Sequence, residues 1–129
     1  MVQIKVYGNR ENLNKIKDKL SDVIHSCAVD ALSLPKDKKF HRFFPLEEPD
    51  FRYPDERSEN YTIIEIICFE GRSVDAKKKL IKLLFERINK ELGISANDIE
   101  ITIFETPRCN WGIRGVSGDE LKLNYKIGI

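Results

Sequence analysis

Arg72 stands where a positively charged side chain could bind an anion. It follows the apolar run 61–69 after the turn Glu70-Gly71, and the residues from Ser73 onward have the apolar spacing of a helix. The N–H groups at a helix N-terminus and an adjacent guanidinium both favour a carboxylate. This position therefore predicts a site for a small molecule that bears a carboxylate, with a surface turn arginine as the alternative.

A glycine-rich loop further along the chain carries two more candidate residues, Trp111 and Arg114. Trp111 is the only tryptophan, and its ring suits either the wall of a pocket or an anchor in a core or interface. Arg114 would supply a second positive group to the same pocket. We therefore expect Arg72, Trp111 and Arg114 to be substrate-binding residues.

Three predicted elements would position these residues. The run 61–69 is almost continuously apolar, which is typical of a strand covered on both faces. A helix is predicted from about Ser73, a suitable N-cap, to about Gly93, a suitable C′ residue. The run 99–104 reads as a second strand. The order of strand, helix and strand indicates a βαβ unit.

The first half of the chain has the same order of elements. Residues 2–7 read as a strand, Gly8-Asn9 as a turn, the next residues as a helix that ends at Leu34-Pro35, and 40–44 as a short strand. With an offset of 60 residues, Ile4, Leu20, Ile24 and Ala28 fall on Ile64, Leu80, Leu84 and Ile88. The sequence therefore predicts an α/β fold in which duplicated βαβ units form a four-stranded mixed sheet with two helices on one face.

We expect a single domain of 129 residues. Its parts would be repeat one at about 1–44, a linking loop at 45–60, repeat two at about 61–105, and a C-terminal loop and strand at 106–129. Three prolines and alternating charges exclude regular structure from the linking loop, whose aromatic residues indicate that it is docked. Residues 121–129 read as a terminal strand or hairpin.

The sheet would have one face without helices. The apolar run 63–69 indicates that this face is also covered, and a partner subunit is the expected cover. We therefore expect a homo-oligomer.

Composition argues against several classes of protein. Lys and Arg number 22 against 21 Asp and Glu, so we expect no long-range attraction to nucleic acid or to an anionic membrane. No apolar run approaches the roughly 20 residues that span a bilayer. The three cysteines are far apart and the two histidines have no spaced partner, so we expect a cytoplasmic protein without a metal or cofactor.

Four motifs in order resemble those of a known family. They are Leu34-Pro35-Lys36-Asp37, Arg57-Ser58-Glu59-Asn60, Gly71-Arg72-Ser73 and Asn110-Trp111-Gly112-Ile113-Arg114-Gly115. Together they resemble the tautomerase superfamily, and more closely its malonate-semialdehyde-decarboxylase-like branch. The resemblance implies duplicated βαβ subunits assembled as a homotrimer.

The resemblance also implies two catalytic residues, Val2 and Asp37. Members of the family expose an N-terminal proline whose amine performs the chemistry, whereas this chain has Val2. If Met1 is removed, the amine of Val2 could act as a base or form a Schiff base; the alternative is that Val2 is only the first residue of a buried strand. Asp37 lies where the branch keeps a catalytic carboxylate, and its alternative role is that of a turn residue.

Two functional hypotheses follow. The first is a tautomerase-like enzyme that moves a proton on a small keto or enol carboxylic acid. The second is a catalytically inactive member that acts as a small-ligand binding or interaction protein. A decarboxylase-like reaction is less favoured, because Glu70 stands where some members have a second arginine. His41 is expected to face outward or an interface, and His25 to be partly buried.

Overall fold

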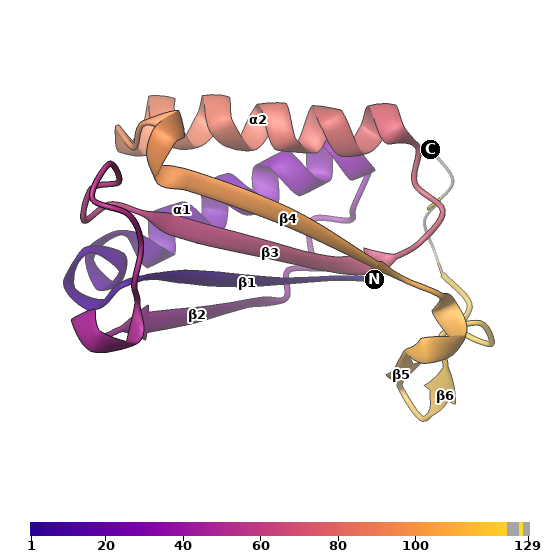
Figure 1. The fold of residues 1–129 in the computed structure, drawn as a ribbon. Helices are drawn as coiled ribbons and strands as arrows, with labels where there is room; N and C mark the ends of the chain where they lie inside the picture. The colour runs from indigo at the N-terminus through magenta and orange to yellow at the C-terminus, as the bar shows by residue number, and fades with distance from the viewer. Residues whose placement is uncertain (124–126, 128–129) are drawn as a thin grey trace.

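The computed structural model describes residues 1–123 and 127. Two helices, α1 and α2, pack on one face of a four-stranded mixed sheet (Figure 1). The strand order is β2-β1-β3-β4, with β1 and β3 antiparallel at the centre and each edge strand parallel to its neighbour. The predicted fold of two βαβ units is confirmed. Among the described residues, no helix is both long enough and apolar enough to cross a membrane.

The main elements run in the order β1 (Val2–Asn9), α1 (Arg10–Leu32), β2 (His41–Leu46), β3 (Thr62–Phe69), α2 (Val74–Leu92) and β4 (Ile99–Thr106). A small hairpin follows, made of β5 (Gly112–Ile113) and β6 (Val116–Ser117). Three short 3₁₀ turns are η1 (Glu48–Asp50), η2 (Ala96–Asp98) and η3 (Arg108–Asn110).

The two ends of α2 have the capping residues that the sequence predicts. The hydroxyl of Ser73 accepts a hydrogen bond from the Ala76 N–H at 3.0 Å, and Gly93 closes the helix with a φ of 70°. The start of α1 differs from the prediction, because Gly8 and Asn9 continue β1 and the helix begins directly at Arg10. The end of α1 comes at Leu32, where Ser33 takes the left-handed conformation before the expected Leu34-Pro35 break.

The hydrophobic core lies between the sheet and the helices. Alternate residues of β1 and β3 point into it, while the alternating residues between them are only half-buried. The helices bury matching stripes against this face, namely Leu13, Leu20, Val23, Ile24, Cys27, Ala28, Ala31 and Leu32 from α1 and Ala76, Leu80, Leu84 and Ile88 from α2. Both helices therefore use the stripes that the repeat predicted.

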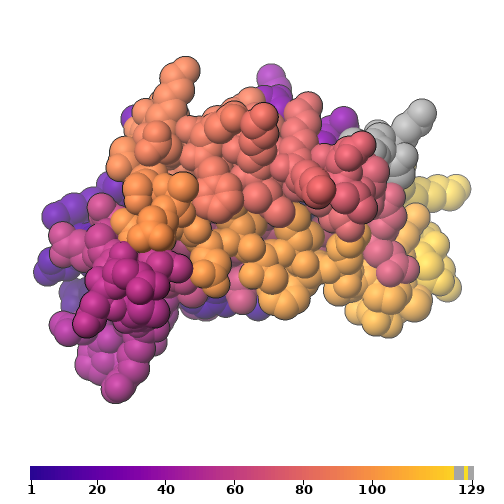
Figure 2. All heavy atoms as spheres, turned by 45° about the horizontal axis from the view of Figure 1, so that its top comes forward, coloured from indigo at the N-terminus to yellow at the C-terminus, as the bar shows by residue number. Residues whose placement is uncertain are grey.

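The linking loop is docked, as expected, although β2 extends through Pro45 to Leu46. Phe51, Tyr53 and Tyr61 form a cluster with ring centroids 5.1 to 5.7 Å apart. The buried carboxylate of Asp98 accepts hydrogen bonds from the N–H and the hydroxyl of Ser58 at 2.8 and 2.5 Å. This loop and the C-terminal hairpin lie at opposite ends of the molecule (Figures 1 and 2).

The duplication extends beyond the elements that revealed it. The 60-residue offset places η1 on η3, the end of β2 on the end of β4, and Phe51 on Trp111. The expected terminal strand or hairpin lies mostly outside the described residues, which leave out 124–126 and 128–129; residues 121–123 are not in a strand. The hairpin that the structure describes is β5–β6.

Candidate active site

The N-terminus lies inside the fold rather than projecting from it. Because β1 and β3 are antiparallel and β3 and β4 are parallel, residue 1 lies at the end of the sheet where β3 and β4 finish (Figure 1). Val2 is 3% exposed and pairs with Cys68, and Met1 is 2% exposed. The Met1 carbonyl accepts a hydrogen bond from the Phe69 N–H at 3.4 Å. The start of the chain is therefore one component of a buried cluster.

The environment of the terminal amine favours its uncharged form. Burial, followed by the positive charge of Arg72, lowers the pKa of the Met1 amine from 8.0 to about 5; Cys68 opposes this shift, and Arg108 adds a smaller lowering. An amine with this pKa is mostly unprotonated at neutral pH. It therefore has the lone pair that a general base or a nucleophile needs.

Arg72 is buried beside this amine. It is 5% exposed, and its Nη1 donates to the Phe69 carbonyl at 3.2 Å, while Nε and Nη2 are buried and have no hydrogen-bond partner among the described residues. Gly71, with a φ of 119°, makes the bend that turns the chain from β3 toward α2. Buried donors without acceptors are costly, and a guanidinium matches a carboxylate through paired hydrogen bonds. The arrangement is chemically suited to an anionic ligand.

Arg108 belongs to the same cluster, and sequence reasoning missed it. Its guanidinium lies 5.4 Å from the centroid of the Phe69 ring and donates to the carbonyls of Gly118 and Leu121 at 3.1 and 2.9 Å. Arg108 thus fastens the C-terminal loop to the end of the sheet while adding positive charge near the amine. The one available signal was its place directly after β4 and Pro107, where the chain leaves the sheet.

Trp111 and Arg114 line one hollow of about 600 Å³, formed by residues 109–117 and Glu120. Trp111 is half-buried and meets Phe69 edge to face at a centroid distance of 5.1 Å, so it also anchors the hairpin. Arg114 is exposed at the hairpin turn with a φ of 52°. Neither Val2, Asp37 nor Arg72 lines this hollow. Of the three predicted binding residues, Trp111 and Arg114 share the hollow. Arg72 lies outside it and donates to the Phe69 carbonyl.

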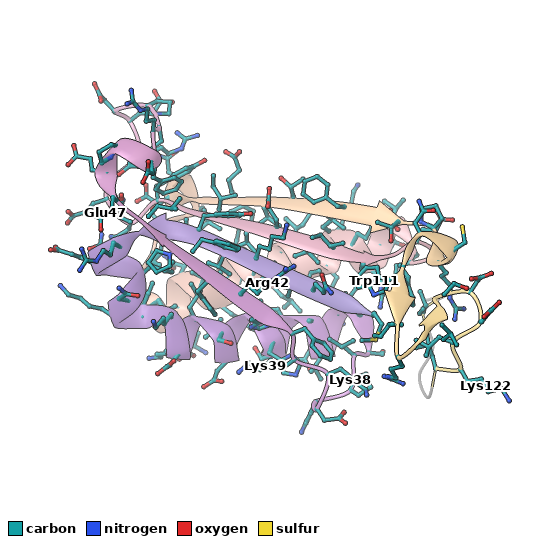
Figure 3. The ribbon with its side chains drawn as sticks, turned by 90° about the horizontal axis from the view of Figure 1, so that it is seen from below. Lys38, Lys39, Arg42, Glu47, Trp111 and Lys122 are labelled. Carbon is teal, nitrogen blue, oxygen red and sulfur yellow. The ribbon has the colours of Figure 1, made fainter. Side chains whose placement is uncertain are left out.

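Asp37 lies on the exposed loop between α1 and β2. The loop enters the sheet at the end where β1 begins, because the Phe40 carbonyl accepts a hydrogen bond from the Ile4 N–H at 2.9 Å. Figure 3 shows Lys38 and Lys39 of this loop at the same end of the sheet as Trp111. Asp37 therefore shares an end of the fold with the amine, but no hydrogen bond joins its carboxylate to Arg72.

His41 was expected to face outward or an interface, and it packs against α1 of its own chain instead. Its Nδ1 lies 2.7 Å from the Ser21 hydroxyl on α1, so the ring faces the helix layer. Burial, followed by the nearby charges of His25 and Lys39, lowers the pKa of His41 from 6.5 to about 4. Alternation along a strand shows which residues share a face, but it does not show which face the helices cover.

At the opposite end of the sheet, the charged side chains are mostly acidic. A hollow of about 910 Å³ lies there, and its lining includes two arginines and five acidic residues, Glu11, Glu47, Glu48, Asp55 and Glu59. The 60-residue offset places Glu48 on Arg108 and Asn12 on Arg72. The two repeats thus build similar ends, and only the end that holds the amine suits an anion.

Residues 38–114 match a family described as a tautomerase enzyme, which is more than half of the chain. The chain belongs to the tautomerase family. It is 26% identical over 98 residues to the probable tautomerase YrdN of Bacillus subtilis, covering 72% of this chain and 75% of the relative. It is also 35% identical over 57 residues to 2-hydroxymuconate tautomerase of Comamonas testosteroni, covering 44% of this chain and 90% of the relative. The second match agrees with a chain that contains the unit twice.

Solved structures share the fold of this chain. An asymmetric trimer of wild-type fused 4-OT superposes with a TM-score of 0.80 at 21% identity, covering 91% of this chain and 96% of that one. Malonate semialdehyde decarboxylase superposes with a TM-score of 0.77 at 20% identity, covering 86% and 89%. Similarities at these identities establish the architecture alone.

Proposed function

We propose that this tautomerase-family protein transfers a proton within a small keto or enol carboxylic acid. The observation that carries the proposal is the start of the chain next to a buried Arg72, where the pKa of the Met1 amine is lowered to about 5; removal of Met1 would expose the Val2 amine at the same end of the sheet. The amine can accept a proton and Arg72 can bind a carboxylate.

The proposed reaction needs only groups of the chain. The amine takes a proton from the enol hydroxyl or from a carbon next to the carbonyl, and the resulting ammonium returns a proton to another carbon of the same molecule. The product is an isomer, so no atom or electron is gained or lost. Arg72 would hold the carboxylate, and Asp37 would assist the transfer from the α1–β2 loop. Trp111 and Arg114 would contribute from the separate hollow that they line, Trp111 as a wall and Arg114 as a second positive group.

Val2 supplies the amine in the form that we propose to be active. Met1 is almost fully buried at the end of β1, so its removal would empty the space next to Arg72 and place the new terminal amine on residue 2. A chain that keeps Met1 would have its own amine in the cluster but no room for a ligand there. The processing of the N-terminus thus sets the level of activity.

We further propose a cytoplasmic homotrimer, related to the malonate-semialdehyde-decarboxylase-like branch. The trimeric form of a neighbour with the same fold and the sheet face without helices support the assembly. Decarboxylation is a weaker candidate than isomerisation, because the exposed Glu70 next to the Gly71 bend would oppose a second negative charge on the substrate.

Two preparations with defined N-termini test the proposal. One begins at Met1 and the other, released from a cleavable fusion, begins at Val2; intact mass confirms each and shows which form the cell produces. Phenylenolpyruvate and 2-hydroxymuconate serve as probes, followed by ultraviolet absorbance. We expect ketonisation by the Val2 form to be at least about tenfold faster than by the Met1 form.

Arg72→Ala in the Val2 form should abolish most of the rate, whereas Arg52→Ala at the acidic end of the sheet should leave it unchanged. A rate no higher than buffer in both preparations would contradict the proposal. If a small carboxylate still bound to such an inactive protein, the binding hypothesis would replace it.

A further inference from the structure

The α1–β2 loop, residues 33–40, is held to α1 by side-chain contacts. Lys36, Asp37 and Lys39 of this loop are exposed, and one backbone hydrogen bond, from the Lys38 N–H to the Pro35 carbonyl at 3.0 Å, forms its turn. A single turn of this kind does not fix where a loop lies on the surface. Leu34 is buried in the core at the start of the loop and the Phe40 carbonyl accepts from the Ile4 N–H at its end, so the contacts to α1 act on the exposed middle, where Asp37 lies.

Three contacts join α1 to this connection. Nε2 of His25 donates to the Lys36 carbonyl at 2.8 Å, since a carbonyl can only accept. The Ser21 hydroxyl shares a hydrogen bond of 2.7 Å with His41 Nδ1, at the start of β2. Lys39 pairs with Asp22 at 2.7 Å, but the Asp22 carboxylate is 77% exposed, so this ion pair contributes little.

The two histidine rings also pack on each other. Their centroids are 5.9 Å apart at an interplanar angle of 72°, an edge-to-face contact. Ser21 and His25 are four residues apart on α1 and therefore lie on the same face of the helix. His25 thus holds the loop just before Asp37, and His41, the residue at which the loop enters the sheet, is held to Ser21 of α1.

We propose that His25 and His41 are positioning residues that hold the 33–40 loop, and with it Asp37, at the amine end of the sheet. The pair does not touch the reacting atoms. It acts through the loop backbone, because the His25 hydrogen bond ends on the carbonyl of the residue next to Asp37. The catalytic consequence rests on the proposed role of Asp37, whereas the holding of the loop does not depend on it.

Amide hydrogen exchange of the full chain tests the holding of the loop. His25→Phe keeps a ring against His41 but removes the donor, so exchange of the Lys38 amide, which forms the turn of the loop, should rise about tenfold while the amides of Ile64 and Ile66 in β3 stay protected. His25→Gln restores a donor at the Nε2 position and should return the loop to wild-type protection. Asp22→Asn, which removes only the exposed ion pair, is the matched control and should change nothing.

Unchanged loop exchange in His25→Phe would overturn the proposal, and so would an equal rise in β3, which would indicate a general loss of stability. If His25→Phe does not fold, Ser21→Ala removes the His41 contact and must raise exchange at residues 39–41.

In a protein that ketonises the probes, His25→Phe should lower kcat several-fold with KM unchanged and His25→Gln should restore it. A loosened loop with wild-type kcat would overturn the catalytic part alone. In an inactive protein, exchange still decides whether the loop is held.

Discussion

Arg72 shows at the scale of one residue how a binding group and a stable fold conflict. This guanidinium is 5% exposed, and two of its nitrogens have no hydrogen-bond partner among the described residues. It lowers the stability of the protein unless a ligand supplies the missing acceptors. Arg108 adds a second positive charge and no acceptor for these nitrogens. An anion that completes the hydrogen bonds of Arg72 would remove this cost, which is why we assign the carboxylate of the ligand to it.

Arg72→Met should separate stability from binding. Replacing the unpaired buried charge with an apolar chain of similar length should raise the free energy of unfolding by about 1 kcal/mol, measured by urea denaturation. Binding of a small 2-oxo acid, followed by calorimetry, should weaken more than about tenfold. A loss of both stability and binding would mean that Arg72 has a structural partner and is not reserved for a ligand.

Gly118 is the residue on which the C-terminal loop depends. A Cβ there would collide with the Arg108 carbonyl and lie 3.0 Å from Cζ of Phe69. We expect Gly118→Ala to lower the free energy of unfolding by about 2 kcal/mol and to shift the emission of Trp111, which packs on the same Phe69 ring. Gly112→Ala is the matched control, because a Cβ at residue 112 meets nothing within 4 Å. Equal stability of the two variants would contradict this account.

At the scale of elements, the seam between α1 and β2 is the part that should respond most to acid. His41 lies in it with a pKa lowered to about 4, mainly because burial penalises the charged ring. His25 and Lys39 add to this effect and Asp22 opposes it. The edge strand β2 therefore depends on a histidine that stays neutral in the folded protein.

The stability of the fold should fall as the pH is lowered through this range. The unfolded chain binds the His41 proton near pH 6.5 and the folded chain only near pH 4, so the stabilisation is complete above 6.5 and is lost between these values. The loss is roughly 3 kcal/mol at most. His41→Phe should remove this part of the pH dependence, measured as the difference between urea unfolding curves at pH 7 and pH 4.5. An unchanged difference would show that His41 is not the group responsible.

At the scale of the whole molecule, the sheet face without helices is the main unexplained surface. The register places Gln3 of β1, Ile67 of β3 and Phe104 of β4 in one row across this face. Phe40, one residue before β2, lies on the same face, and Phe40 and Phe104 are 46% and 45% exposed. Tyr7 and Phe44 stack further along at 4.8 Å. A face with this much apolar surface is suited to burial against other copies of the chain.

Phe104→Lys should convert the proposed trimer into monomers, as measured by light scattering after size exclusion, because a charge would be buried in the interface. Val74→Lys introduces the same side chain at a position that is 61% exposed at the start of α2 and should leave the mass unchanged. A wild-type protein that already has the mass of a monomer would rule out the assembly.

The sequence by itself determined the elements, their duplication, the capping residues Ser73 and Gly93, and the place of Arg72 at the end of a strand. These features follow from short-range periodicity and local backbone preference, and the residues that carry these signals lie within a few positions of one another in the sequence. The candidate site depends on contacts between residues that are far apart in the sequence. Only the antiparallel pairing of β1 with β3 placed the buried amine against Arg72, and only the layer of α1 decided that His41 faces inward. A pKa and a buried face are set by whatever the fold packs around a group, so the tertiary structure had to supply them.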